Sequence, residues 1–120
     1  MKILVVDDSK AMRLIVKRTL RQAGLDGHEI SEAVNGAEAL KAIKADAPDL
    51  ILSDWNMPEL NGLELLQALK KDGFGGKFGF VTTEGSPDMR RTAVENGALF
   101  LITKPFTAEM FTLVLGPLLS

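Results

Sequence analysis

Short apolar runs alternate with longer segments of helical periodicity along the whole chain, and this alternation limits the possible folds more than any other feature. The apolar runs are too short for helices and predict strands. The segments between them carry apolar residues three and four positions apart, as a helix with one buried face does. Strands are expected at residues 3–6, 29–33, 50–53, 78–82 and 99–103. Five βα units predict an α/β fold, a doubly wound parallel five-stranded sheet covered by helices on both faces.

The helices between these strands have recognisable ends. Asn35 is expected to cap the second helix, with Glu38 as its capping-box partner. Ser86 and Pro87 begin the fourth, and Thr107 caps the fifth. The first helix is expected to end at Gly24 and the fifth at Gly116 and Pro117. The apolar stripe expected on the first helix comprises Met12, Ile15, Val16, Leu20 and Ala23, and that on the third comprises Gly62, Leu65, Leu66 and Leu69.

Length and composition exclude several classes of protein. With 120 residues, 46% hydrophobic, the chain predicts one domain spanning residues 1–120. A net charge of −2 provides no general field for nucleic acid or anionic membrane, so neither is an expected partner. No apolar run is long enough to span a bilayer, which predicts a soluble, cytoplasmic protein. The chain has no cysteine and one histidine, which excludes disulfides, thiolate catalysis and Cys-bound zinc and argues against a His-based metal site.

Acidic residues follow two of the predicted strands directly. Asp7 and Asp8 come after the first strand, and Asp54 comes after the third. The carboxyl ends of parallel strands form the edge where such sheets bind ligands. Asp8 alone has an alternative role as the N-cap of the first helix, but a cap explains one aspartate and not two. Three adjacent carboxylates repel unless a cation lies among them, and an all-oxygen site suits Mg²⁺.

Two further polar residues follow strands at the same edge. Thr82 ends the fourth strand, and Lys104, followed by Pro105, ends the fifth. Thr82 has an alternative role as an ordinary β-branched strand residue, and Lys104 as a lysine that only lies over the sheet edge. Taken together, three carboxylates, a divalent cation, an ammonium and a hydroxyl describe a site for phosphoryl transfer onto a carboxylate.

These motifs resemble the complete set found in the response-regulator receiver family, over essentially the whole chain. Residues 53–58 read SDWNMP and residues 61–66 read NGLELL, which is similar to the CheY-like chemotaxis branch of that family. The resemblance implies a flavodoxin-like sheet with strand order 2-1-3-4-5, an order that the sequence pattern alone does not supply.

The resemblance also implies residue roles. Asp54 would accept a phosphoryl group from the phosphohistidine of a sensor histidine kinase or phosphotransfer protein, or from a small acyl phosphate. Asp8, Asp54 and the backbone carbonyl of Asn56 would bind Mg²⁺ directly, and Asp7 would bind it through water. The protein would catalyse its own phosphorylation and dephosphorylation without turning over an external substrate.

The resemblance implies that the remaining site residues transmit the signal and set the lifetime of the phosphorylated state. Lys104 would pair with the phosphoryl group, and the Thr82 hydroxyl would turn toward it and shift the fourth helix and fifth strand. Asn56 and Glu84 match the positions that tune self-dephosphorylation, which predicts a short-lived phosphorylated state. The signal would pass to a downstream output protein through the face formed by the fourth helix, fifth strand and fifth helix.

Leu101 departs from the family pattern. Three residues before Lys104 the family usually has an aromatic switch residue, and this chain has leucine. Phe100 lies one position earlier and is expected on the opposite side of the strand. The sequence therefore predicts a readout without the usual aromatic rotation.

The fifth helix carries more apolar residues than one buried face needs. A core-facing stripe accounts for about half of them. The rest are expected to form an exposed patch for a partner or a weak homodimer, or else to reflect frayed packing after Pro117. The residues are Met110, Phe111, Leu113, Val114, Leu115, Leu118 and Leu119.

The favoured function is a stand-alone receiver that relays a phosphorylation signal, with chemotaxis as its most specific form. A phosphorelay shuttle or adaptor remains an alternative. A less favoured one is a Mg²⁺-dependent phosphohydrolase with an aspartate nucleophile, because such enzymes carry that residue after the first strand and Asp54 follows the third. A degenerate binding module would be expected to lose part of the acidic cluster, Thr82 or Lys104.

Overall fold

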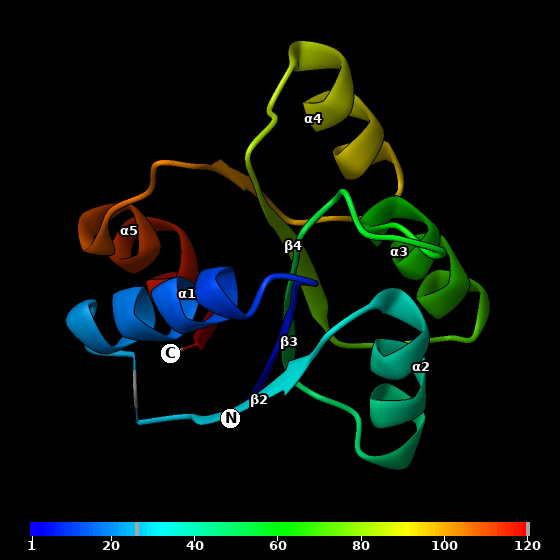
Figure 1. Cartoon of the computed structure of the whole chain (residues 1–120), viewed down its shortest axis with the longest axis horizontal. Coiled ribbons are helices and arrows are strands. Elements are labelled where there is room, and N and C mark those ends of the chain that lie inside the picture. Colours follow the sequence, from blue (N-terminus) through cyan, green and yellow to red (C-terminus); the bar gives the residue numbers. More distant parts are fainter. Residues whose placement is uncertain (26, 120) are drawn as a thin grey trace.

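The computed structural model describes residues 1–25 and 27–119, and in that part of the chain strands and helices alternate without exception (Figure 1). The strands are parallel and lie in the order β2-β1-β3-β4-β5. This order confirms the fold class and the order implied by the family resemblance. The elements are β1 (Lys2–Val6), α1 (Lys10–Gln22), β2 (Glu29–Ala33), α2 (Gly36–Ala45), β3 (Leu50–Ser53), α3 (Gly62–Lys71), β4 (Lys77–Thr82), α4 (Pro87–Glu95), β5 (Leu101–Thr103) and α5 (Ala108–Leu119).

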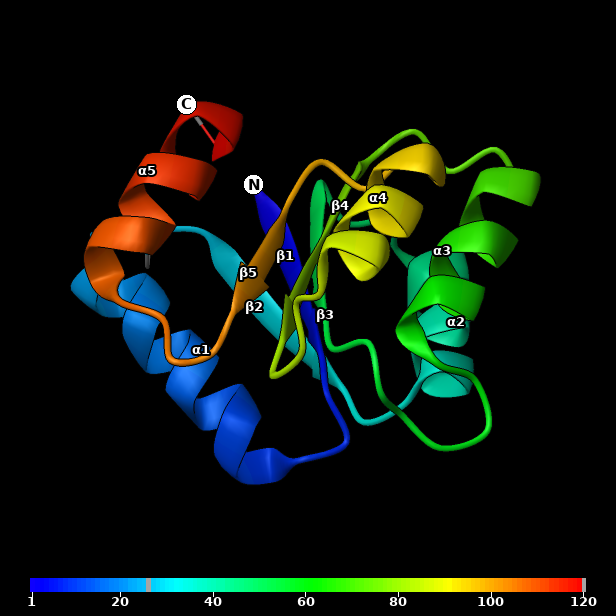
Figure 2. The same ribbon diagram turned by 90° about the horizontal axis from the view of Figure 1, so that it is seen from above.

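The sheet separates two hydrophobic clusters. Helices α1 and α5 cover one face, and α2, α3 and α4 cover the other (Figure 2). Alternate residues of the central strands point to opposite faces, so Leu4 and Ile51 join the second cluster while Ile3 and Leu50 join the first. Because both faces are covered, β1 and β3 are buried and apolar except for Lys2 at the start of β1 and Ser53 at the end of β3.

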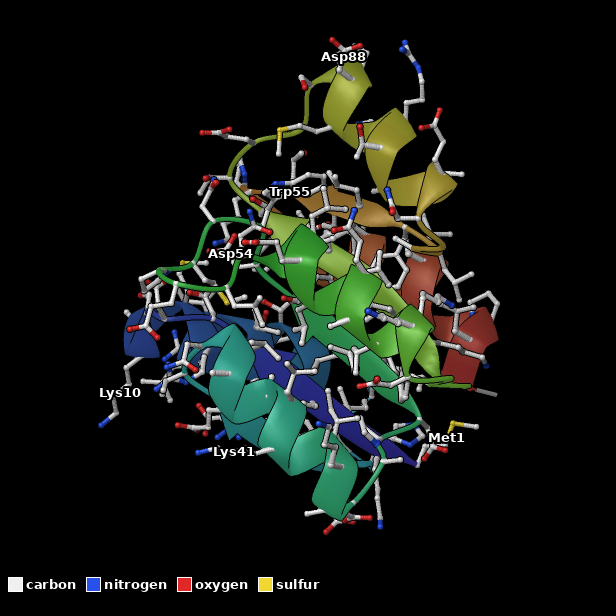
Figure 3. The ribbon with its side chains drawn as sticks, turned by 90° about the vertical axis from the view of Figure 1, so that its right-hand side faces the viewer. Met1, Lys10, Lys41, Asp54, Trp55 and Asp88 are labelled. Atoms are coloured by element: carbon white, nitrogen blue, oxygen red, sulfur yellow. The ribbon has the colours of Figure 1, made fainter. Side chains whose placement is uncertain are left out.

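The parallel arrangement brings the carboxyl ends of all strands to one edge. Asp54 lies at this edge, at the same end of the molecule as Lys10, while Met1 lies at the opposite end (Figure 3). The register pairs Val6 of β1 with Ser53 of β3, so the residues that follow these two strands leave the sheet side by side.

The buried face of α1 differs from the expected one. Val16 and Leu20 are buried as expected, but Ile15 is 43% exposed, and Arg13 and Thr19 lie on the buried face. The helix is therefore rotated relative to the predicted stripe. A polar residue can occupy this face because the guanidinium of Arg13 has carbonyl and carboxylate acceptors there.

The N-cap alternative for Asp8 is wrong. Ser9 caps α1, with its hydroxyl accepting a hydrogen bond of 3.2 Å from the Met12 amide. The exposed Asp8 carboxylate is thus left for another role. The expected caps at Asn35, Ser86 and Thr107 are confirmed, although the structure gives the Asn35 cap without a return bond from Glu38.

Pro117 does not end α5 where the sequence analysis expected. The helix continues to Leu119, with Leu115 and Leu119 buried in the core. At the end of the helix the Lys77 ammonium donates a 2.6 Å hydrogen bond to the Leu118 carbonyl. Burial and this bond hold the last turn, where a proline disrupts fewer helical hydrogen bonds than in mid-helix.

The apolar residues of α5 are mostly core. Phe111, like Leu115 and Leu119, is buried, and Met110, Val114 and Leu118 are partly buried against the same cluster. Leu113 is the exception, with 77% exposure. The alternative of a frayed helix end after Pro117 is therefore wrong, whereas association through the remaining exposed surface stays a prediction.

Strand β5 is shorter than expected and begins at Leu101 rather than Leu99. The Leu99 amide still donates to the Phe78 carbonyl at 2.8 Å, but its side chain is 53% exposed. Leu101 and Phe100 face opposite sides of the sheet as predicted, because Leu101 belongs to the α2, α3 and α4 cluster and Phe100 packs against the other.

Within the described residues, no helix is long and apolar enough to cross a membrane.

Candidate functional site

Three carboxylates converge at the carboxyl edge of the sheet. One oxygen from each of Asp7, Asp8 and Asp54 lies within 4.8 Å of the other two. Asp7 is buried, Asp54 is partly buried and Asp8 is exposed, so the cluster opens to solvent on one side. Three anionic oxygens at this spacing, with an open side for water, fit a small hard divalent cation. The structure thus brings together the three residues that the sequence predicted as a metal cluster.

Asp7 is the most constrained of the three. Its Oδ1 accepts a 2.9 Å hydrogen bond from the Ser9 amide, and its Oδ2 lies 3.7 Å from the ammonium of Lys104. Burial raises the pKa of Asp7, and the nearby charge of Asp54 raises it further, while the Ser9 amide and Lys104 act in the opposite direction. Since burial and like charge oppose ionisation here, a cation beside Asp7 would stabilise its ionised form.

Asp54 stands at the end of β3 in a tightly bonded turn. Its amide donates to the Val6 carbonyl at 2.9 Å, and its own Oδ1 accepts from the Trp55 amide at 2.8 Å. The Gly62 amide then donates to the Trp55 carbonyl at 2.8 Å and closes the loop onto the start of α3. These bonds fix the direction in which the Asp54 carboxylate leaves the strand.

Gly62 permits this closure. A Cβ at position 62 would lie 2.2 Å from the Asp54 carbonyl oxygen and 2.9 Å from the Phe80 ring. No side chain can occupy that space, so glycine is required by the close approach of backbone to backbone. The sequence pattern indicated Gly62 only as part of the core-facing stripe of α3, without this role.

Thr82 and Lys104 enter the same edge from neighbouring strands. The Lys104 amide donates to the Thr82 carbonyl at 2.9 Å, so the two residues are adjacent across the β4–β5 pair. Thr82 is fully buried, and its hydroxyl accepts a long 3.5 Å hydrogen bond from the Glu84 amide. The ion pair between Lys104 and Asp7 joins this side of the edge to the carboxylates. The Lys104–Pro105 peptide bond that follows is cis.

The residues expected to modulate the site differ in exposure. Asn56, Glu84 and Pro105 are exposed. Leu101 is 9% exposed and belongs to the same hydrophobic cluster as Ala93 of α4. A hollow of about 430 Å³ between the ends of α2 and α3 is lined by none of the predicted site residues, whereas a smaller one of about 270 Å³ is lined by Lys104 and Pro105 together with residues of α1.

Arg13 is a site residue that the sequence analysis missed. It is 8% exposed, and its Nη1 donates a 2.6 Å hydrogen bond to the backbone carbonyl of Asp7. Position 13 lies three residues before Val16 and seven before Leu20, on their face of the helix. A charged residue in register with a buried stripe was the signal available in the sequence.

Comparisons with known proteins match one family over nearly the whole chain. The model of the response regulator receiver domain matches residues 3–115. The chemotaxis protein CheY1 of Helicobacter pylori is 41% identical over 113 residues, covering 92% of this chain and 90% of the relative. A chemotaxis protein CheY homolog of Campylobacter jejuni is 42% identical over 116 residues, covering 92% and 85%.

Solved structures agree with the sequence relatives. The chemotaxis response regulator CheY4 of Vibrio cholerae superposes with a TM-score of 0.85 at 34% identity, over 98% of both chains. A receiver domain of a Francisella response regulator gives 0.86 at 28% identity, over 98% of this chain and 94% of that one.

Proposed function

The chain belongs to the response regulator receiver family as a CheY-like receiver domain, and from this membership we propose that it accepts a phosphoryl group on Asp54. The observation that carries the proposal is the convergence of Asp54 with two further carboxylates at one sheet edge, beside Lys104 and Thr82. Such a set of groups matches the requirements of phosphoryl transfer to a carboxylate.

Mg²⁺ is the proposed cofactor, because every available side-chain ligand is a hard oxygen. Asp8, Asp54 and the Asn56 carbonyl would hold it directly, and Asp7 through water. When bound, the ion supplies positive charge that stabilises the oxygens of the transferring group. A cation also relieves the repulsion between Asp7 and Asp54, which contributes to the raised pKa of Asp7.

In the proposed reaction a carboxylate oxygen of Asp54 attacks the phosphorus of the donor. A new P–O bond forms, and the bond from phosphorus to the donor nitrogen or acyl oxygen breaks, with its electron pair leaving on the donor. The Lys104 ammonium is then available to pair with a phosphoryl oxygen, and the Thr82 hydroxyl can donate to another. The bound phosphoryl group carries about −1.5 to −2 charges, and because the Asp54 carboxylate loses its own charge in the acyl phosphate, the net addition at the sheet edge is about one negative charge or slightly less.

We further propose that this charge is read on the face of α4, β5 and α5 without an aromatic rotation. Leu101, at the family's switch position, is a buried aliphatic residue, and Phe100 packs on the other side of the sheet. Chemical shifts of the native and phosphorylated protein test this. Shifts at Leu101 and along α4 are expected, and their absence would contradict it.

The pathway is proposed from the relatives, because both sequence relatives described above are named chemotaxis proteins. Phosphoryl donors would be a cytoplasmic histidine kinase or phosphotransfer protein, and the receiver would act on a separate output protein. Asn56 and Glu84 are both exposed and occupy the positions that tune self-dephosphorylation in the family, which supports rapid loss of the phosphoryl group by attack of water. A lifetime of many hours in the Mg²⁺-bound protein would contradict that part of the proposal.

Intact mass after brief incubation with a small acyl phosphate tests the proposal directly. One added phosphoryl group is expected in the native protein with Mg²⁺, and none in Asp54→Asn or in native protein treated with a chelator. An adduct that persists in Asp54→Asn would overturn the assignment of the acceptor. Multiple turnover on a phosphate ester would instead favour a phosphohydrolase.

A further inference from the structure

The guanidinium of Arg13 is a buried cation at the base of the candidate site. Only 10% of its side chain is exposed. Its Nη1 donates to the Asp7 carbonyl at 2.6 Å, and its Nε donates to the Glu32 carboxylate at 3.0 Å. It therefore joins the backbone of the first aspartate to a side chain on the neighbouring strand β2.

Glu32 is itself fixed in place. Its second oxygen accepts a 3.2 Å hydrogen bond from the ammonium of Lys17, one turn along α1. Burial alone would raise the pKa of Glu32, but hydrogen bonds from Lys17 and Arg13 lower it overall, so the group stays ionised at neutral pH. A negative anchor thus holds the fork of Arg13 in one orientation.

Asp7 is held through its amide, its carbonyl and its side chain. The Asp7 amide donates to the Ala33 carbonyl at 3.2 Å, and the Asp7 carbonyl accepts from Arg13. The Asp7 side chain is bonded in turn to the Ser9 amide. The carbonyl of Asp7 belongs to the peptide plane that leads into Asp8, so its orientation sets the direction in which the Asp8 carboxylate is presented.

We propose that Arg13 is a positioning residue for the metal cluster, which orients the Asp7–Asp8 peptide so that both carboxylates point toward Asp54. The proposal rests on the proposed function, because it takes the carboxylate cluster as the Mg²⁺ site. Arg13 bonds to the Asp7 carbonyl and to Glu32, so it would act on the cluster through Asp7. Lysine at this position would supply one charge but not the fixed fork that reaches a carbonyl and a carboxylate together.

The sign of the effect separates positioning from simple electrostatics. A cation near a carboxylate cluster opposes the binding of another cation, so removing the charge of Arg13 should tighten Mg²⁺ binding if charge were its whole contribution. If Arg13 positions the ligands, its removal should weaken binding instead. An arginine that only stabilises the fold would leave the affinity of the folded protein unchanged.

Calorimetric titration with MgCl₂ alone, at fixed ionic strength and neutral pH, measures this without any phosphoryl donor. The variants are Arg13→Met, Arg13→Lys and the matched control Lys17→Met, which removes a charge from the same Glu32 cluster without a bond to Asp7. We expect both Arg13 variants to bind Mg²⁺ roughly tenfold more weakly, as for other groups that orient metal ligands. Lys17→Met should weaken Mg²⁺ binding much less than either Arg13 variant, because it loosens Glu32 but leaves the bond from Arg13 to the Asp7 carbonyl in place.

Thermal unfolding of each variant shows that the titrated protein is folded, and Arg13→Lys retains the charge and stem if Arg13→Met does not fold. Unchanged or tighter binding in a folded Arg13 variant would overturn the positioning role. Equal weakening in Lys17→Met would also overturn it. A native protein that binds no Mg²⁺ would overturn the proposed metal site as well, and so is distinct from failure of the Arg13 role alone.

Discussion

Helices α3 and α4 cover the same face of the sheet (Figure 2) but bury very different amounts of their surface. Helix α3 buries Gly62, Leu65, Leu66 and Leu69, and its start is locked by a complete capping box between Asn61 and Glu64. In α4, every residue of which is described, Ala93 alone is buried, and Val94 is 67% exposed. Helix α3, which follows the acceptor loop, is thus part of the core. Helix α4 contacts the core mainly through Ala93.

This difference matches two requirements of a signalling domain. Groups that perform chemistry need fixed geometry, which packed elements and bonded turns provide. Elements that change position with the signal come from the less stable part of a fold, where little apolar surface is lost on movement. The loop from Thr82 to α4 connects the two regions, so the same edge supplies both a rigid site and a movable neighbour.

The largest expected loss of stability is at Gly62, in the rigid region formed by the acceptor loop and α3. Gly62→Ala would place a methyl group 2.2 Å from the Asp54 carbonyl, and neither backbone can yield without moving the acceptor. We expect a loss of about 3 kcal/mol in unfolding free energy, together with loss of phosphorylation, because overpacking against backbone is poorly relieved. Denaturant unfolding and intact mass measure the two effects.

Gly75→Ala is the matched control, because a Cβ there meets nothing within 4 Å and the residue is exposed in the connection between α3 and β4. We expect its stability to change by less than about 0.5 kcal/mol. Equal losses in the two variants would remove the claimed rigidity of the acceptor loop.

A glycine-to-alanine substitution at Gly85, in the loop that leads to α4, should lower the free energy of unfolding less. Gly85→Ala would bring a Cβ to 2.1 Å from Thr103 Cγ2, but the opposing atom is a side-chain methyl group and not backbone as at Gly62. We expect a loss of about 1 kcal/mol. The double variant with Thr103→Ser, which lacks the opposing methyl group, should recover most of it, as a double-mutant cycle would show. No recovery would mean that another contact limits this loop.

Unlike the glycine substitutions, replacement of Asp7 is expected to raise the free energy of unfolding, by an amount that depends on pH. Its pKa is raised in the folded state, so its contribution to stability is present at acidic pH and is lost as pH rises through the folded pKa. At neutral pH without metal, Asp7→Asn should therefore be more stable than the native protein, by about 1 kcal/mol. The difference should shrink at acidic pH. Denaturant unfolding in a chelator at both pH values tests this, and a less stable Asp7→Asn at neutral pH would contradict it.

The smallest effect is expected on α4 itself. Val94→Ala removes a side chain that is already in solvent, so unfolding free energy should change by less than about 0.5 kcal/mol. Hydrogen exchange should nevertheless distinguish the helices, with α4 amides exchanging faster than those of α3. Equal protection in both helices would break the comparison.

Much of this arrangement was predictable from the sequence. The strand positions followed from apolar runs, and the residues that meet at the carboxyl edge followed from where those runs end, since parallel strands bring Asp7, Asp54 and Lys104 to one side. Caps at Asn35 and Ser86 followed from local hydrogen-bond chemistry. These features depend on neighbours in sequence or on the period of a strand.

Features that depend on distant partners were not predictable in the same way. The face of α1 was wrong because Arg13 is stabilised inside by Glu32, nineteen positions away. The end of α5 was wrong because Lys77 and the core hold a turn that contains Pro117. The close approach of Gly62 to Asp54 requires the path of a loop, which no local pattern specifies.

Trp55 lies next to the acceptor, and its ring packs on that of Phe80 with centroids 4.6 Å apart. The chain has one tryptophan and no tyrosine, so its ultraviolet emission arises essentially from this single indole. Phe80 belongs to β4, the strand that leads to Thr82, so the indole is in contact with both the acceptor loop and the strand beside it. The protein thus contains a built-in optical reporter at the junction of the two regions, and quenching of its emission would follow ion binding and phosphorylation in real time without any attached dye.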